Sequence, residues 1–444
     1  MKRANRSSER NKAVVIGGSI AGLLSAKILA DYFHRVIIVE KDKLPDTPQP
    51  RRGVPQSVQP HVLFARGYRI LGELFPEIEA KLIANGALSI DWAKEFKHFF
   101  AGHWSSTSEN SSDVVSITCS RYVLEWTIRQ ELSKLPQINF IEADKVTELI
   151  YDATENSIKG ICLQSPEKIN ADLVVDASGR SSQALKWLEQ IEVTTVPKTV
   201  VNPFLGYATR RYKISKDVKL NWKVLLISQT PPKDKRLGYL AKIENNELIA
   251  TLGGYGKDFP PLDDAGFQEF AKSLGQPDFY KAIAISTPSS PIYAHRATVN
   301  RLRHYEKVKL PAGFIAIGDA VCALCPVYGQ GMTVAALGAK TLQSWLEKSA
   351  NKKLNNNLFQ KQLAKSNSLH WRLATSQDAR FPTTIGGIDK PNIIDNLMAG
   401  YANKLIDKSI YEPQLHLLFL EVTHLLRSPL ALYHPKVMLQ VLTS

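Results

Sequence analysis

Two glycine-rich segments lie far apart in the chain, and the first has the residue types and spacing that nucleotide binding requires. The first reads Gly17-Gly18-Ser19-Ile20-Ala21-Gly22, with glycines where a tight turn and a close helix–strand contact need them and a small residue at Ser19. Backbone N–H groups at such a turn bind the phosphates of a dinucleotide. Glu40 follows eighteen residues after Gly22, and its carboxylate can accept hydrogen bonds from both hydroxyls of a ribose.

The second segment lies about three hundred residues further along. An apolar run from Gly313 ends at Gly318-Asp319, and a loop with Pro326, Gly329, Gln330 and Gly331 leads into an apolar segment from Met332 to Lys348. An acid after a strand, followed by a glycine loop and a helix start, places a carboxylate and free N–H groups at one sheet edge. The second segment is thus a strand that ends in an acid, followed by a glycine loop and a helix.

The elements that must position the first segment are also readable. Ala13–Ile16 and Val36–Val39 are short apolar runs typical of buried strands, and Ile20, Leu23, Leu24 and Ile28 have helical spacing. Strand, turn, helix, strand and terminal acid together predict a βαβ dinucleotide unit. The glycines at 253–256 are followed by no such helix, which argues against a second dinucleotide domain.

Composition indicates a soluble globular chain of about three domain-sized units: 444 residues, 44% hydrophobic and 22% charged. Four cysteines are too few for a disulfide framework, so we expect a reducing, cytoplasmic setting. The net charge is +14, and the tail Met1–Lys12 is basic. We interpret that tail as a solvated terminus, with attraction to anionic cofactors or a membrane surface as the alternatives. Nucleic acid is not expected, because no basic stretch alternates with aromatic residues.

Two segments could be mistaken for export or membrane signals. The basic tail followed by an apolar run resembles a signal peptide, and 320–339 is uncharged over the length of a membrane span. Gly17, Gly18 and Gly22 interrupt the first, and Pro326 and further glycines interrupt the second. Neither is expected to act as such a signal.

The two motifs together resemble the FAD-dependent aromatic hydroxylases and their epoxidase relatives, the single-component (class A) flavin monooxygenases. Three further segments are similar to motifs of that family: Arg51-Arg52-Gly53, Ser120-Arg121 through Glu125, and Asp176 through Gly179-Arg180. The resemblance covers about residues 13–345 and implies FAD as cofactor, with NADPH or NADH as transient electron donor. The cofactor-binding residues implied by the motifs and the resemblance are Gly17, Gly18, Ser19, Ile20, Ala21, Gly22, Glu40, Lys41, Arg51, Arg52, Arg121, Asp176, Asp319, Pro326, Gly329, Gln330, Gly331 and Met332.

Some positions depart from the family pattern. Cys322 stands where the aromatic hydroxylases usually carry histidine, and Thr333 where they carry asparagine. These changes are closer to the polyene epoxidase and halogenase-like branches. The tryptophan halogenases carry a Trp-x-Trp pair, and no two of the seven tryptophans here are two residues apart. Cys322 and Cys325 form a CxxC that could be a redox pair, although filling of apolar space beside the loop is favoured. No metal site is expected.

The resemblance implies an α/β fold: a Rossmann-like FAD-binding domain with an inserted antiparallel β-sheet substrate domain and a C-terminal helical region. We expect the FAD-binding domain in 13–89, 119–192 and 296–349, the substrate domain in 90–118 and 193–295, and the helical region in 350–444. Asn245-Asn246 predicts a two-residue hairpin within that sheet. The candidate pocket aromatics are Phe99, Phe100, Trp104, Tyr207, Trp222 and Tyr239, each with an ordinary core role as the alternative. A leucine-rich helix over 414–426 is expected against the flavin domain, with membrane-surface docking as the less favoured alternative.

The function implied is a monooxygenase that inserts one oxygen atom of O2 into a small hydrophobic aromatic or alkene substrate through a flavin C4a-hydroperoxide. No side chain is assigned as catalytic, because the cofactor carries the chemistry. His61, His103, Arg210 and Arg211 are candidates for polarising the substrate. A flavin-dependent halogenase and a non-catalytic FAD-binding protein are the alternatives. Substrate identity and oligomeric state are not determined by the sequence.

Overall fold

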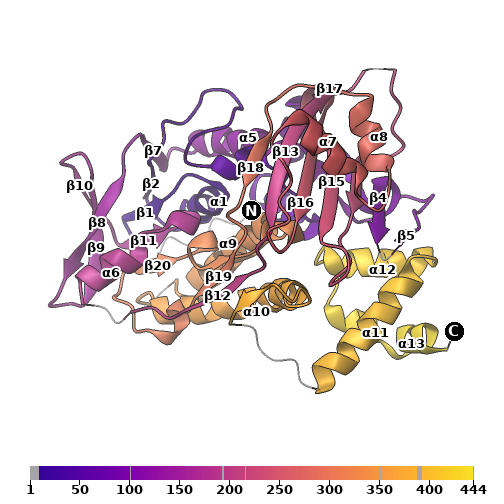
Figure 1. Cartoon of the computed structure of the whole chain (residues 1–444). Helices are drawn as coiled ribbons and strands as arrows, with labels where there is room; N and C mark the ends of the chain where they lie inside the picture. Colours follow the sequence, from indigo (N-terminus) through magenta and orange to yellow (C-terminus); the bar gives the residue numbers. More distant parts are fainter. Residues whose placement is uncertain are drawn as a thin grey trace.

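A parallel sheet and an antiparallel sheet lie side by side, and the C-terminal helices pack beneath the second (Figure 1). The computed structural model describes residues 10–100, 102–192, 195–215, 217–350, 352–387 and 393–443, with only the backbone described for 393–399. Most of the basic tail that begins at Met1 lies outside the described residues. The architecture is the mixed α/β fold that the sequence predicts.

The predicted βαβ unit forms the centre of a five-stranded parallel sheet with the order β20-β11-β1-β2-β7. Its strands are β1 (Lys12–Ile16), β2 (Arg35–Glu40), β7 (Ile138–Glu142), β11 (Leu173–Asp176) and β20 (Phe314–Ala316). Because all four pairings are parallel, the carboxyl ends of these strands meet at one edge. Glu40, Asp176 and Asp319 are therefore brought to the same side of the sheet, next to the glycine turn after β1.

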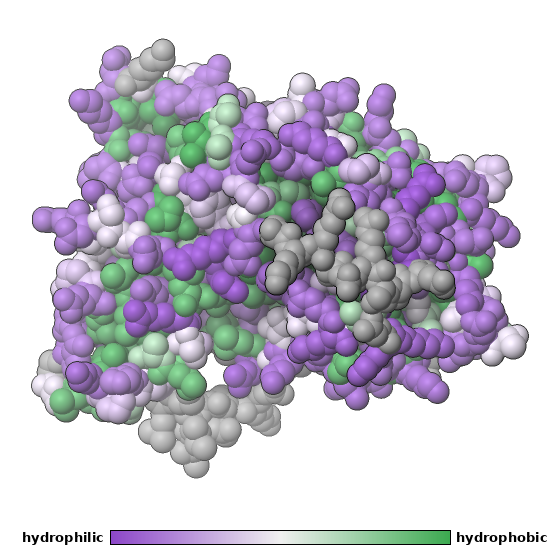
Figure 2. Space-filling model, turned by 180° about the vertical axis from the view of Figure 1, so that it is seen from behind, coloured by the Kyte–Doolittle hydropathy of each residue, from purple (hydrophilic) through white to green (hydrophobic). Residues whose placement is uncertain are grey.

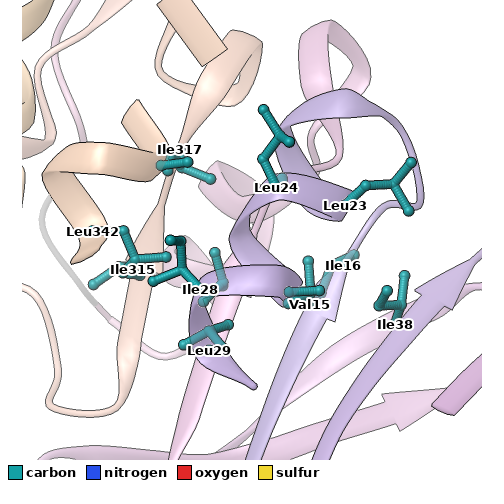
Figure 3. Close-up of a cluster of buried hydrophobic side chains, with 14 of the residues drawn as sticks. Val15, Ile16, Leu23, Leu24, Ile28, Leu29, Ile38, Ile315, Ile317 and Leu342 are labelled. Atoms are coloured by element: carbon teal, nitrogen blue, oxygen red, sulfur yellow. The ribbon is translucent and has the colours of Figure 1, made fainter. Parts of the chain in front are cut away.

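Helix α1 (Ile20–Leu29) packs against both this sheet and helix α9 (Gly331–Lys348). Leu24 and Ile28 of α1 gather with Ile315, Ile317 and Leu342, so that the first and last parts of the nucleotide-binding motif share one core (Figure 3). All five side chains are at most 2% exposed. The burial of such side chains, at about 1.5–3 kcal/mol each, fixes the two glycine loops relative to one another.

The antiparallel sheet has eight strands in the order β17-β13-β16-β15-β14-β4-β5, with β18 also paired to β13. The longest are β13 (Gly206–Lys213), β15 (Arg236–Ile243) and β16 (Glu247–Gly254). The early strand β4 (Phe96–Phe100) joins β14 (Val224–Ile227) in parallel. Helices α7 (Asp264–Lys272) and α8 (Asp278–Ala284) cover the outer face. The remaining strands of this sheet are β5 (His103–Trp104), β17 (Thr287–Pro288) and β18 (Tyr293–His295).

The hairpin between β15 and β16 differs from the two-residue turn predicted at Asn245-Asn246. Ile243 pairs with Glu247, so the connection has three residues, Glu244–Asn246. The Oε2 of Glu244 accepts a 2.8 Å hydrogen bond from the N–H of Ser120, and Glu244 is buried. This contact with a distant segment holds Glu244 outside the strand ladder, which a local turn pattern does not show.

The other elements form smaller sheets and covering helices. A four-stranded sheet runs β21-β19-β12-β22, and two further sheets run β10-β9-β8 and β3-β6. Their bounds are β3 (Leu88–Asp91), β6 (Val115–Thr118), β8 (Val146–Asp152), β9 (Ser157–Leu163), β10 (Lys168–Asn170), β12 (Lys198–Asn202), β19 (Asn300–Arg303), β21 (Cys322–Ala323) and β22 (Ile385–Gly386). The helices are α2 (Ala65–Leu74), α3 (Ile78–Ala84), α4 (Trp92–Glu95), α5 (Arg121–Ser133) and α6 (Ala184–Gln190).

Four helices complete the chain: α10 (Asn356–Asp378), α11 (Ile393–Ser409), α12 (Pro413–Thr423) and α13 (Pro435–Leu442). The leucine-rich α12 was expected against the flavin domain, and its segment does contact helix α2 of that domain, but it also packs on the antiparallel sheet. Leu420 packs in a cluster with Trp92, Phe96 and Val224, so α12 covers the antiparallel sheet and the start of α2. Among the described residues, no helix combines the length and the apolar character that crossing a membrane requires. Seen from behind, the surface is mostly hydrophilic with scattered apolar areas (Figure 2).

Candidate functional site

The turn after β1 has the geometry of a phosphate-binding turn. Gly17 has φ +105°, and a Cβ at this position would lie 2.7 Å from the carbonyl oxygen of Ala177. A Cβ on Gly22 would lie 1.8 Å from the carbonyl oxygen of Gly17. Both positions therefore accept only glycine. Ser19 is the N-cap residue of α1 but its side chain makes no cap hydrogen bond, so the first N–H groups of α1, including those of Ile20 and Ala21, have no side-chain cap.

Glu40 lies at the end of β2, directly beside this turn. Its Oε2 accepts a 2.8 Å hydrogen bond from the N–H of Gly18, and its Oε1 accepts from the N–H of Asp42 at 3.1 Å. The carboxylate is thus held at the turn in a fixed orientation, as a ribose-binding acid must be. The next residue, Lys41, is exposed.

Arg51 connects the acids of this region. Its guanidinium lies 3.1 Å from Glu40, 2.8 Å from Asp42 and 2.9 Å from Glu125, and the side chain is buried. Burial alone would lower the pKa of Arg51, but Glu125 and Glu40 outweigh it and hold the pKa above its usual value. Arg51 therefore stays charged and neutralises an otherwise acidic group. Its neighbour Arg52 is exposed and lies outside this cluster.

Arg121, the first residue of α5, provides the positive charge closest to the glycine turn. One of its NH2 donors bonds the Oγ of Ser19 at 2.8 Å, and Ser19 in turn donates to Glu125 at 2.7 Å. The Nε–H of Arg121 is buried and has no partner among the described residues. Burial lowers the pKa of Arg121 while Glu125 raises it. A buried, unpaired guanidinium donor beside a helix N-terminus fits an anionic group such as a pyrophosphate.

Asp176 holds the loop that follows β11 through hydrogen bonds. It is fully buried, and its oxygens accept hydrogen bonds from the N–H of Ser178 at 3.0 Å and from the hydroxyls of Ser178 and Ser182. It can therefore act on a ligand only through the loop that it holds. Gly179 in that loop has φ +76°, and no atom lies within 4 Å of the place where its Cβ would stand.

Asp319 follows β20 in a short 3-10 turn, Gly318–Ala320, and its side chain is 40% exposed. Gly318 approaches α1 so closely that a Cβ there would lie 2.7 Å from the Cβ of Ala21. The two glycine motifs thus touch. Arg180, which follows Gly179, places its Nε 3.6 Å from an oxygen of Asp319. The motif that contains Arg180 gave this residue no separate role, and only the fold brings its side chain next to Asp319.

The loop before α9 is partly exposed, most of all at Pro326 and Gly331. Pro326–Tyr328 form a 3-10 turn, Gly329 has φ +64°, and Gln330 is the N-cap residue of α9 without a side-chain cap bond. No atom lies within 4 Å of the Cβ position of Gly331, whereas Met332 is buried. The N-terminus of α9 therefore has free N–H groups and the positive end of its dipole at this loop.

Of the four residues considered for polarising a substrate, the structure brings only His61 to the site. His61 is close to Arg121 and His295, and burial together with these charges lowers its pKa to about 3, so the ring is neutral. Arg210 pairs with Asp264, Arg211 bonds the hydroxyl of Tyr122, and His103 bonds Tyr411. His295 was missed by the sequence reasoning. It lies near Arg180, stacks on Tyr207, and has its pKa lowered to about 4, chiefly by burial.

The candidate pocket aromatics separate onto two faces of the antiparallel sheet. Phe99, Trp104 and Trp222 pack with α7 and α8 on the outer face, so they are corrected to core residues. Tyr239 belongs to the inner cluster, and Phe100 lies 5.7 Å from the ring of His98. Alternate residues of a strand point to opposite faces of the sheet, so the neighbours Phe99 and Phe100 lie on different faces. Tyr207 packs beside Cys325.

The CxxC pair does not have the properties of a redox motif. Cys322 and Cys325 are both free and buried. Burial raises the pKa of Cys322 to about 12, and the nearby Asp319 acts in the same direction. Both thiols therefore remain protonated at neutral pH, and they fill apolar space beside the loop.

Comparison with solved structures defines the class of fold. The brominase Bmp2 superposes with a TM-score of 0.64 at 13% identity, covering 91% of this chain and 92% of that one. PqsL from Pseudomonas aeruginosa, in complex with 2-aminobenzoylacetate, gives 0.61 at 15% identity, with coverage of 92% and 98%. A flavoprotein/dehydrogenase from Cytophaga hutchinsonii gives 0.66 at 13% identity, with 93% and 92%. The chain has the fold of the flavin-dependent monooxygenases and halogenases.

At the sequence level, the chain is similar to Protein Rv3254 of Mycobacterium tuberculosis (strain ATCC 25618 / H37Rv). The two are 31% identical over 350 residues, which cover 76% of this chain and 73% of that protein. The chain belongs to the same family as Protein Rv3254. No model of a described protein family matches it.

Proposed function

We propose that the protein is an FAD-dependent monooxygenase that transfers one oxygen atom of O2 to a small hydrophobic aromatic or alkene substrate. The observation that carries this proposal is the meeting of the two glycine motifs: the turn at Gly17, the acid Glu40, the unpaired donor of Arg121 and the exposed loop at Gly331 lie along one sheet edge. The fold shared with PqsL and Bmp2 supports it.

The residues fit FAD in a definite order. The first N–H groups of α1 and Arg121 would hold the pyrophosphate, and Glu40 would bind the adenosine ribose. Asp319 would bind the ribityl chain, and the N–H groups at Gly331 and Met332 would face the flavin. When bound, FAD supplies hydride acceptance from NADPH or NADH and oxygen transfer from O2.

The chain's own groups then provide binding, charge and exclusion of water. The N-terminus of α9 would stabilise negative charge that develops on its ligand, because its first N–H groups have no side-chain cap. The neutral ring of His61 can donate a hydrogen bond at one nitrogen and accept one at the other without adding charge, and its Nδ1 lies 3.0 Å from the carbonyl oxygen of Gln59. The apolar inner face of the antiparallel sheet, with Tyr239 and Leu226, would exclude water from the substrate.

Two measurements test the proposal. The purified protein is expected to release one FAD on denaturation, and substrate is expected to stimulate its NAD(P)H oxidation. Product formed under ¹⁸O₂ should carry the label without any need for chloride or bromide. A halogenated product or halide-dependent turnover would instead support a halogenase, and a protein that binds FAD without any turnover would be a non-catalytic flavin binder. Failure to bind FAD at micromolar concentration would refute all three.

A further inference from the structure

The loop 325–330, which would lie along the flavin, is held by Asp378, a residue that belongs to none of the motifs of the sequence analysis. Asp378, the last residue of α10, is fully buried. Its carboxylate accepts hydrogen bonds from the hydroxyl of Tyr328 at 2.5 Å and from the side-chain amide of Asn300 at 2.6 Å. The other end of that amide, Oδ1 of Asn300, accepts from the N–H of Cys325 at 2.7 Å. One carboxylate thus fixes both ends of the segment 325–328.

The same helix makes a second contact with the loop. Nδ1 of His370 lies 3.0 Å from Oε1 of Gln330, and His370 is buried. His370 and Asp378 are about two turns apart, so they lie on one side of α10. Their loop partners, Tyr328 and Gln330, flank Gly329, whose left-handed conformation turns the chain into α9.

The carboxylate of Asp378 lies where a negative charge is unfavourable. Among the described residues, Asp378 forms no ion pair with a lysine, arginine or histidine. It also lies at the C-terminus of α10, where the helix dipole disfavours negative charge. Burial raises its pKa to about 6, although bonds from Tyr328, Asn300 and Tyr255 act against the shift. A buried carboxyl without a cation costs stability, so a role in holding the loop accounts for its position better than packing does.

We propose that helix α10 is a positioning element of the cofactor site, in which Asp378 holds the loop 325–330 through Tyr328 and Asn300, and His370 holds it through Gln330. The inference rests on the proposed function, because the loop matters only if it contacts FAD. Asp378 and His370 act through the loop and contact no reacting atom.

Tyr255 provides a matched control for the experiment. Its hydroxyl also bonds Oδ1 of Asp378, at 3.3 Å, but Tyr255 follows β16 and does not belong to the loop. Tyr255→Phe and Tyr328→Phe therefore each remove one tyrosine hydrogen bond from the same carboxylate. Only the second removes the bond that joins the loop to Asp378 directly, although the ring of Tyr255 also packs against Cys325 and Tyr328.

The first measurement is FAD affinity, with the absorption spectrum of the bound flavin. Tyr328→Phe is expected to bind FAD about tenfold more weakly, as loss of one charge-assisted bond predicts, and to shift the flavin spectrum. Asp378→Asn should weaken FAD binding at least as much as Tyr328→Phe does. The double variant Tyr328→Phe/Asp378→Asn should bind FAD with the same affinity as Asp378→Asn alone. Tyr255→Phe should stay within about twofold of wild type. Equal losses for the two tyrosine variants, or unchanged binding by Tyr328→Phe, would overturn the proposal.

The second measurement separates this proposal from the proposed function. Hydrogen exchange of peptides covering 323–333 is followed in the FAD-free proteins. Exchange should be faster in Tyr328→Phe and in Asp378→Asn, and unchanged in Tyr255→Phe. If wild type fails to bind FAD, the proposed function is wrong, and the exchange result alone decides whether the loop is held. If Asp378→Asn does not fold, the two tyrosine variants carry the test, and equal exchange in them refutes the proposal.

Discussion

Gly331 and Gly72 form a matched pair of helical glycines at the residue scale. At both, no atom lies within 4 Å of the place where a Cβ would stand. Gly331 begins α9 beside the exposed loop, whereas Gly72 lies in α2. Gly331→Ala is expected to leave the unfolding free energy unchanged or slightly raised but to weaken FAD binding at least tenfold, because the methyl group enters the flavin space. Gly72→Ala should stabilise the protein by about 0.5–1 kcal/mol through helix propensity and bind FAD normally.

Calorimetric unfolding and FAD titration of these two variants check the prediction. Gly22→Ala is the opposite case, since its Cβ would lie 1.8 Å from a backbone oxygen. That variant should fail to fold stably. Normal FAD binding by Gly331→Ala would mean that the loop does not face the cofactor.

Asp319 allows a second residue-scale prediction. Its ion pair with Arg180 spans 3.6 Å and is partly exposed, so the pair contributes little to stability. Asp319→Ala is therefore expected to fold with nearly unchanged unfolding free energy while losing FAD. Asp319→Asn should lose less, because a hydrogen-bonding group remains. Retained FAD in Asp319→Ala, measured by equilibrium dialysis, would reduce the late motif to a structural turn.

At the scale of elements, His424 shows how the C-terminal helices are attached. Its Nδ1 accepts the N–H of Ala65 at 3.2 Å, and its carbonyl oxygen accepts the N–H of Arg66 at 3.2 Å. His424 thus caps the N-terminus of α2, which has no side-chain cap of its own. Its ring also packs between Phe64 and Trp92.

Acid should weaken this attachment. Burial lowers the pKa of His424 to about 3, below the value of about 6.5 in an unfolded chain. The unfolded state therefore takes up the proton first as pH falls below 6.5, and stability is lost until the folded pKa is reached. Between pH 6 and 4 we expect a loss of about 1.4 kcal/mol per pH unit from this residue. His98 and His416, with pKa values lowered to about 3 and about 4 by burial, should add to it.

His424→Asn provides the check, because its Oδ1 can accept the same N–H but does not titrate. Denaturant unfolding from pH 7 to 4 should give a flatter profile for the variant, at a lower stability at pH 7 from the lost ring contacts. An unchanged slope would mean that His424 does not carry the pH dependence.

At the scale of the molecule, FAD would join two segments that the fold alone brings together. The turn after β1 would take the adenosine side, and the loop before α9 the flavin side. FAD at a hundred times its Kd should stabilise the protein by about 2.7 kcal/mol. ADP and FMN, each fitting one half, should bind more weakly and together stabilise less than FAD. Thermal unfolding followed by tryptophan fluorescence measures this, and equal effects of FMN and FAD would argue against the adenosine site.

The sequence by itself determined the βαβ unit with its glycine turn, because its signals are local. A strand, a glycine turn and a helix follow one another around Gly17 and Gly22. At both positions a side chain would collide with the backbone, so only glycine fits. The C-terminal region was also predicted to be helical, and the helix expected over 414–426 corresponds to α12 (Pro413–Thr423). The fold class followed from the resemblance of these motifs, in their order along the chain, to the class A flavin monooxygenases.

Only the tertiary structure decided the contacts between distant segments. The pairing of Arg51 with Glu125, the cap that His424 gives to α2, and the hold of Asp378 on Tyr328 leave no local pattern in the sequence. Burial and hydrogen bonding at these sites depend on which faces meet. Alternation along β4 separates Phe99 from Phe100 and His98, but only the packing of α7 and α8 decided that Phe99 became a core residue. Composition and residue spacing determine the helices and strands of this protein. The packing between those elements determines which charged groups of the site pair and which residues hold its loops in place.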